Sequence, residues 1–133
     1  MKVAFQMDPI ENIDINADST FRIMEEAQDR GHELYYYQPT DLYYHDRKVR
    51  AHVLPIKVQR TGANHYEVGE RKSVDLDEFD VVWLRQDPPF DMLYITTTFL
   101  LERVRENTLV INDPYWVRNS PEKLMILDFK NLM

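Results

Sequence analysis

Short apolar runs alternate along this chain with segments whose apolar residues recur at helical spacing. The apolar runs predict strands at 3–7, 33–37, 79–84 and 109–111, and the periodic segments predict helices at 18–30 and 92–104. Strands that are joined by a helix pair in parallel, with a right-handed crossover. The sequence therefore predicts an α/β fold, a Rossmann-like arrangement around a mainly parallel sheet.

The first predicted strand–helix–strand unit carries clear start and stop signals. Asp8-Pro9 stops the first strand, and Asp18 or Ser19 offers an oxygen to cap the helix that follows. Gly31 stands where a glycine commonly ends a helix. We therefore expect a complete unit within about the first 37 residues, a length compatible with a βαβ motif.

The stretch from 41 to 78 is too long for a structureless connection. Alternating apolar residues from Val49 to Val53 predict a strand, the pattern changes phase at Leu54-Pro55, and a turn is predicted at 61–64. We interpret the stretch as an antiparallel hairpin excursion at a sheet edge, because a proline suits an edge strand better than a central one.

Composition narrows the class of protein. The chain has 133 residues, 44% of them hydrophobic, which suits one folded domain. Its net charge of −7 argues against nucleic acid or an anionic membrane as the main partner. It has no cysteine and no apolar run of membrane-spanning length, and its four histidines lack metal-ligand spacing. No glycine-rich phosphate-binding motif is present. We expect a cytoplasmic protein.

Polar residues follow three of the predicted core strands. Asp8 follows the first strand, and Arg85 and Asp87 follow the third; Asn112 and Asp113 follow the fourth. Ligands of an open parallel sheet bind outside the carboxyl ends of its strands, so we expect these residues to share one edge. Asp and Asn are also turn formers, and for the last two residues both interpretations stay open.

Arg85 is the strongest candidate for ligand binding. It begins the stretch Arg85–Asp91, in which two prolines restrict the backbone. An arginine is a poor turn former, whereas its planar guanidinium suits a carboxylate or a phosphate. We predict that Arg85 binds an anionic ligand. The alternative is a structural ion pair with Asp8, Asp87 or Asp91.

The chain's end predicts one more helix. Asn112-Asp113-Pro114 is expected to stop the last strand, and Ser120-Pro121-Glu122 has the cap hydroxyl, proline and acid that open a helix.

Segments spread over nearly the whole chain resemble, in the same order, the N-terminal domain of prokaryotic glutathione synthetases. These segments are Met7–Ile10, Asp18–Phe21, Glu26–Glu33, Asp41–Tyr43, Arg50–His52, Arg85–Asp91, Asn112–Pro114 and Glu122–Leu124. The resemblance implies that family's pre-ATP-grasp fold, a Rossmann-like three-layer α/β domain, which agrees with the alternation of strands and helices described above.

The resemblance also implies an activity. Members of the family join γ-glutamylcysteine to glycine with ATP and Mg²⁺: the dipeptide carboxylate is phosphorylated, and the glycine amine attacks the acyl phosphate. Their N-terminal domain helps to bind the dipeptide, and a C-terminal ATP-grasp domain holds ATP and the metal ions. Members form homo-oligomers, so we expect a homo-oligomer here.

Individual residues take expected roles from the same resemblance. Arg85 matches a family arginine that clamps a substrate carboxylate, and Asp8 and Ser19 match positions that border the same site. Asp87 is expected to orient Arg85 or the proline turn. Lys123 matches a lysine that approaches the nucleotide, although its sequence context alone indicates a solvated lysine in the first turn of the last helix. We expect no catalytic residue and no metal ligand in this chain.

The chain departs from the family at two points. Gln86 stands where lysine is common in the family, and the chain ends at Met133, before an ATP-grasp domain. We expect residues 1–119 to form the substrate-binding domain and residues 120–133 to begin the connection to a missing domain, so that this fragment would be inactive alone. The alternative is a stand-alone module that binds a small molecule or mediates oligomerisation without catalysis.

Overall fold

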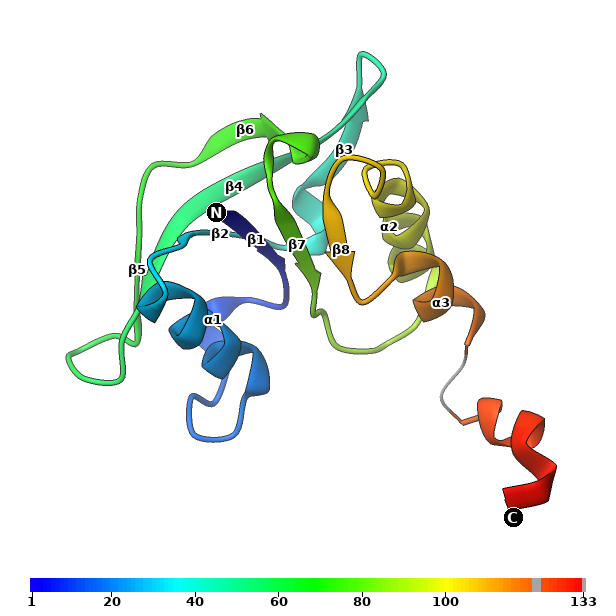
Figure 1. Cartoon of the computed structure of the whole chain (residues 1–133). Helices are drawn as coiled ribbons and strands as arrows, with labels where there is room; N and C mark the ends of the chain where they lie inside the picture. The colour runs from blue at the N-terminus through cyan, green and yellow to red at the C-terminus, as the bar shows by residue number, and fades with distance from the viewer. Residues whose placement is uncertain (121–122, 133) are drawn as a thin grey trace.

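The computed structural model describes residues 1–120 and 123–132, and these form a mixed α/β fold around a curled sheet (Figure 1). The strands are β1 (Lys2–Gln6), β2 (Glu33–Tyr37), β3 (Leu42–His45), β4 (Lys48–Val58), β5 (Tyr66–Val68), β6 (Lys72–Asp75), β7 (Val81–Leu84) and β8 (Leu109–Ile111). Their order is β3-β4-β2-β1-β7-β8, with β5 and β6 also paired to β4. The pairs β1–β2, β1–β7 and β7–β8 are parallel and the pairs of β4 are antiparallel. The predicted fold class is confirmed.

The helices of the described residues join and cover these strands. They are α1 (Ser19–Asp29), α2 (Met92–Glu102) and α3 (Pro114–Asn119), with 3₁₀ turns η1 (Ile10–Asn12), η2 (Pro39–Asp41), η3 (Leu76–Glu78) and η4 (Met125–Leu132). None of these helices combines the length and the apolar character that crossing a lipid bilayer requires.

The β1–α1–β2 unit forms as its local signals predict. The Asp18 carboxylate accepts a hydrogen bond from the backbone N–H of Phe21 at 2.8 Å and so caps α1. Gly31, with φ of 82°, follows the helix in the left-handed region that glycine adopts at little cost. Phe21 and Met24 are completely buried on the face of α1 that packs on the sheet.

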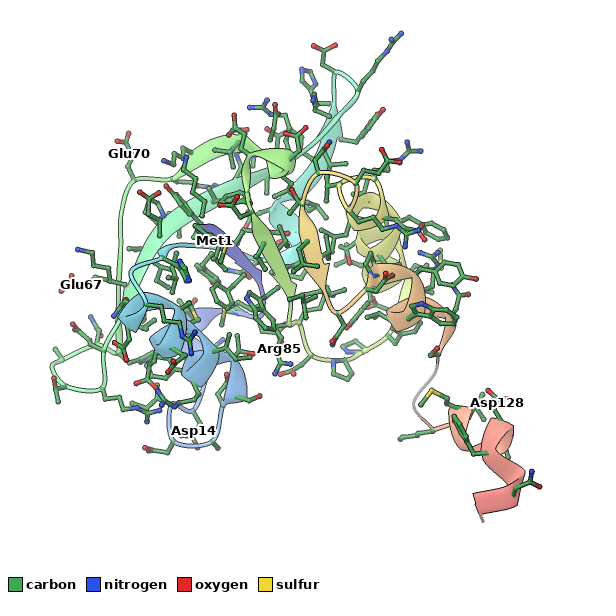
Figure 2. The ribbon with its side chains drawn as sticks, in the orientation of Figure 1. Met1, Asp14, Glu67, Glu70, Arg85 and Asp128 are labelled. Atoms are coloured by element: carbon green, nitrogen blue, oxygen red, sulfur yellow. The ribbon has the colours of Figure 1, made fainter. Side chains whose placement is uncertain are left out.

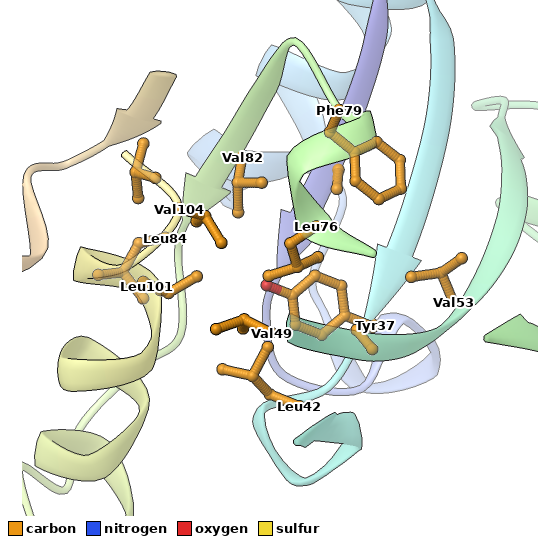
Figure 3. Packing of buried hydrophobic residues seen from close by; sticks show 13 residues of the cluster. Tyr37, Leu42, Val49, Val53, Leu76, Phe79, Val82, Leu84, Leu101 and Val104 are labelled. Atoms are coloured by element: carbon orange, nitrogen blue, oxygen red, sulfur yellow. The ribbon is translucent and has the colours of Figure 1, made fainter. Parts of the chain in front are cut away.

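Two hydrophobic cores lie on opposite faces of the sheet. Successive residues of β1 alternate between them: Val3 and Phe5 pack with α1, whereas Ala4 packs with α2. Figure 3 shows the second core, in which Leu101 and Val104 approach Val82 and Leu84 of β7. The sheet is therefore covered by α1 on one side and by α2 on the other.

The hairpin excursion is present beyond β2, at one end of the sheet, but β4, which carries Pro55, is an interior strand and not the edge strand expected for a proline. β4 lies between β2 and β3 on one side and β5 and β6 on the other, since Arg50 and Ala51 pair with β3 and with β6 at once. Pro55 fits because its carbonyl accepts from the backbone N–H of Gly69, in the gap between β5 and β6. The N and C=O of one residue face the same side of a strand, so the missing proline donor faces that gap rather than β2.

The predicted phase change in β4 moves the strand from one core to the other. Val49, Ala51 and Val53 belong to the α2 core, whereas Ile56 and Val58 belong to the α1 core. Leu54 and Pro55, between these two groups, pair with β2. β4 thus contributes to both cores, as β1 does.

The region after β7 differs in part from the prediction. α2 ends at Glu102 rather than 104, and Leu93 in its first turn is 49% exposed. Asp113 accepts a hydrogen bond from the backbone N–H of Tyr115 and Pro114 occupies the first turn, so Asn112-Asp113-Pro114 opens α3 as well as stopping β8.

The structure describes only part of the segment in which a helix was expected to begin at Ser120. Ser120 ends α3, and Pro121 and Glu122 lie outside the described residues. The division between residues 1–119 and 120–133 stays a prediction.

Candidate functional site

The carboxyl ends of β1 and β7 lie side by side, and their pairing continues into the loops that follow. Gln6 is in register with Leu84, and the backbone N–H of Arg85 donates to the carbonyl of Gln6 at 2.8 Å. The Asp8 carboxylate then accepts from the backbone N–H of Asp87, also at 2.8 Å. The two parallel strands therefore bring these polar residues to one edge of the sheet, where Figure 2 labels Arg85.

Arg85 reaches the first turn of α1. Its Nη2 donates to the hydroxyl of Ser19 at 2.7 Å, and its Nε donates to the hydroxyl of Thr20 at 3.0 Å. Thr20 is buried, whereas Arg85 is half-buried and Ser19 is exposed. These bonds fix the plane of the guanidinium, and they leave its remaining N–H groups without a protein acceptor among the described residues. The group is oriented, partly accessible and available to an anion.

The expected competing ion pair does not form in the part of the chain that the structure describes. Arg85 makes no salt bridge within 4.0 Å to Asp8, Asp87 or Asp91. Asp91 caps α2 instead, since its carboxylate accepts from the backbone N–H of Tyr94 at 3.0 Å. Arg85 is held by neutral hydroxyls, which do not neutralise its charge.

A pair of carboxyl groups lies beside the guanidinium. Partial burial, the charge of Asp8 and a hydrogen bond with Asp8 raise the pKa of Asp87 above its ordinary value, and the Asp18 charge adds to the effect. The Arg85 guanidinium acts in the opposite direction and lowers the pKa. The edge thus offers a cation and carboxylates close enough to influence one another, an arrangement that can bind both ends of a zwitterion.

A buried chain of hydrogen bonds ends at the same edge. Tyr37, the last residue of β2, donates its hydroxyl to Oε1 of Gln6 at 2.8 Å, and Nε2 of Gln6 donates to Oε1 of Gln86. Gln6 and Tyr37 are buried, and Gln86 is half-buried. Sequence reasoning missed Gln6 and Thr20 as parts of this site. A glutamine inside an apolar strand, directly before the polar loop, was the signal for Gln6.

Asn112 and Asp113 follow β8 at the same carboxyl edge, because β8 pairs in parallel with β7. The side-chain hydrogen bonds of the described residues do not link them to Arg85 or Gln86. Asp113 caps α3 and accepts from Arg105 at 3.2 Å, which is a structural role, and Asn112 is exposed. Lys123 is exposed, and η4, which follows it, lies apart from the Arg85 edge in Figure 2.

The described residues do not supply a metal site. Among residues 1–120 and 123–132, no three histidine, aspartate or glutamate side chains gather to hold an ion.

Comparison with known proteins confirms the family that the sequence resembles. The family model of the prokaryotic glutathione synthetase N-terminal domain matches residues 1–118. The glutathione synthetase of Mesorhizobium japonicum is 51% identical over 133 residues, which are 100% of this chain and 42% of that protein. The corresponding protein of Brucella melitensis biotype 1 is 53% identical over 133 residues, 100% of this chain and 43% of its own length. That of Escherichia coli O127:H6 is 39% identical over 133 residues, 99% of this chain and 42% of its own length. The chain thus spans about 42% of the length of the first of these relatives.

Proposed function

This chain belongs to the prokaryotic glutathione synthetase N-terminal domain family, and from that premise we propose that it forms the dipeptide-binding part of a glutathione synthetase. The whole protein would join γ-glutamylcysteine to glycine at the expense of ATP, in the cytoplasm. The observation that carries the proposal for this chain is the Arg85 guanidinium, which Ser19 and Thr20 orient at the carboxyl edge of the sheet.

The charges at the edge suit an amino-acid end of a peptide. An ordered guanidinium binds a carboxylate through charge-assisted hydrogen bonds, which are stronger than neutral ones. The neighbouring carboxyl groups of Asp8 and Asp87 attract an ammonium group. The glutamyl end of γ-glutamylcysteine carries a free carboxylate and a free ammonium on one carbon. A simple dianion would meet repulsion from Asp8 and Asp87, so the mixture of charges favours the zwitterionic dipeptide over a phosphate.

We propose that ATP and magnesium bind away from the Arg85 edge. The described residues do not fit a magnesium site, because they hold no cluster of ligating side chains. Lys123 is the residue of this chain that we propose for contact with ATP, on the family resemblance and its exposure. An ammonium group could neutralise phosphate oxygens there.

The proposal is tested by substitution of Arg85 in the full-length protein. Arg85→Ala should raise KM for γ-glutamylcysteine by about 10-fold to 100-fold, the effect of losing a charged hydrogen bond of about 1.5–3 kcal/mol. The KM for ATP should stay unchanged. Arg85→Lys should recover only part of the loss, because an ammonium lacks the planar fork.

Lys123→Ala provides the reciprocal control in the same assay. It should raise KM for ATP and leave KM for the dipeptide unchanged. An Arg85→Ala enzyme with an unaltered dipeptide KM would remove Arg85 from the binding site.

An oligomerisation role has its own supporting observation. A hollow of about 270 Å³ on the α1 side of the sheet is lined mainly by apolar side chains: Val3, Ile23, Ala27, Val81, Trp83 and Ile111. Apolar surface of this kind commonly marks an interface. We propose a homo-oligomer, and light scattering on the full-length protein would reject it by returning the monomer mass.

A further inference from the structure

A chain of hydrogen bonds links Tyr37, Gln6 and Gln86 and runs from the α2 core to the sheet edge that carries Arg85. The proposed dipeptide site does not account for it. Gln6 has no exposed surface and Tyr37 is 1% exposed. Burying an amide and a phenol is costly unless each is hydrogen-bonded, and no buried side-chain N or O atom in residues 1–120 and 123–132 lacks a partner. The network is therefore complete on its inner side.

Tyr37, at the buried end of this hydrogen-bond chain, fixes the direction in which its members donate. Burial raises the pKa of Tyr37, so its hydroxyl keeps its proton and must donate it. The acceptor is Oε1 of Gln6. That choice leaves the amide nitrogen of Gln6 to donate outward, and Oε1 of Gln86 accepts from it. Reversing the two amides would leave the buried phenolic hydrogen without an acceptor, which costs free energy.

Gln86, at the outer end of the hydrogen-bond chain, is then a donor. With its carbonyl oxygen bound to Gln6, Gln86 has its amide N–H groups left for a partner at the edge. Gln86 directly follows Arg85, and successive residues of an extended segment project to opposite faces. Arg85 turns to α1 and Gln86 to the side of Gln6 and Tyr37, so the two side chains straddle the end of β7.

We propose that Gln86 is a specificity-determining residue of this edge, held by Tyr37 and Gln6 so that its amide N–H donates to an oxygen of the ligand that Arg85 binds. The inference rests on the proposed function for the identity of that ligand. A ligand oxygen is favoured over a ligand ammonium at this position, because the Gln86 carbonyl is turned to Gln6 and its N–H groups remain for the ligand. Tyr37 and Gln6 are positioning residues, since they act through Gln86.

The first test is Gln86→Glu in the full-length protein, assayed at about pH 8 so that the new carboxyl is ionised. Glutamate keeps the size of the side chain and the acceptor that Gln6 needs, but it replaces the N–H donor with an anionic oxygen. KM for γ-glutamylcysteine should rise about tenfold or more, with KM for ATP unchanged. Gln59→Glu, the same change in the connection between β4 and β5, should leave both constants unchanged.

The second test separates positioning from simple structural support. Tyr37→Phe removes the group that fixes the polarity, so both amides can reverse; KM for the dipeptide should rise while kcat is retained. In the Gln86→Glu background both oxygens of residue 86 accept, so Gln6 must donate whatever residue 37 is. Tyr37→Phe should therefore add nothing to KM there. Additive effects of the two substitutions would overturn the positioning role.

The outcomes also distinguish this inference from the proposal on which it rests. A raised dipeptide KM in Arg85→Ala with an unchanged KM in Gln86→Glu would overturn the Gln86 contact and leave the dipeptide site standing. Unchanged KM values in both variants would overturn both.

Discussion

The carboxyl group of Asp87 lies among like charges, Asp8 and Asp18, and near one opposite charge, Arg85. Partial burial and then the like charges prevail, and they raise its pKa above the ordinary 3.8. The folded chain therefore holds this proton more tightly than the unfolded chain does. Stability from this group is lost as the pH rises from about 3.8 through the raised pKa, because unfolding releases a proton in that window.

Asp87→Asn should therefore raise Tm near neutral pH, and the gain should disappear at acidic pH, where Asp87 is protonated in both states. Thermal unfolding followed by circular dichroism over a range of pH values measures this. Glu70→Gln changes an exposed carboxylate and serves as the control. A lower Tm for Asp87→Asn near neutral pH would show that the Asp87 charge supports the fold rather than opposing it.

Single residues of the edge differ in how far the sequence could predict them. Arg85 could be singled out because its chemistry is unusual after a strand, and its place at the edge follows from the parallel pairing of β1 with β7. Its hydrogen bond to Ser19 spans 66 positions of the sequence, and no local pattern encodes such a contact. A glutamine inside an apolar strand marks Gln6 as unusual, but nothing local in the sequence identifies Tyr37 and Gln86 as its partners.

Elements whose signals are local were predicted well, and elements defined by distant partners were not. The first unit carries its own cap, apolar stripe and terminal glycine, so α1 and its flanking strands follow from the sequence. The interior position of β4 depends on pairing with four strands, which proline statistics alone misjudged. α3 was missed although Asp113-Pro114 is a helix-start pair, because the same residues also stop a strand.

At the start of α1, the Asp18 cap should contribute measurably to the stability of the fold. Asp18→Ala removes the acceptor for the backbone N–H of Phe21 and should lower the free energy of unfolding by about 1 kcal/mol, measured by urea denaturation. Asp18→Asn keeps a side-chain oxygen and should retain most of the stability. Equal losses in both variants would attribute the effect to the charge of Asp18 and not to its hydrogen bond.

At the scale of the whole molecule, the two cores should unfold together because β4 contributes to both. Leu101→Ala in one core and Met24→Ala in the other remove completely buried side chains, and each should cost about 2–5 kcal/mol. In both variants, tryptophan fluorescence and far-ultraviolet circular dichroism should give one coincident denaturation curve. Two separated transitions in either variant would mean that the cores are independent units.

The crossing of β4 from one core to the other has a consequence for how this chain tolerates changes in length. Between Val49 and Val58 every position has an assigned side of the sheet. One extra or one missing residue before Leu54 would turn the apolar side chains upstream of it towards the wrong layer, since strand side chains alternate strictly. The turn at 61–64 carries no such parity, because its residues are exposed and it joins β4 to β5. Natural variants of this domain should therefore vary in length at 61–64 while the strand before it keeps a constant count of residues.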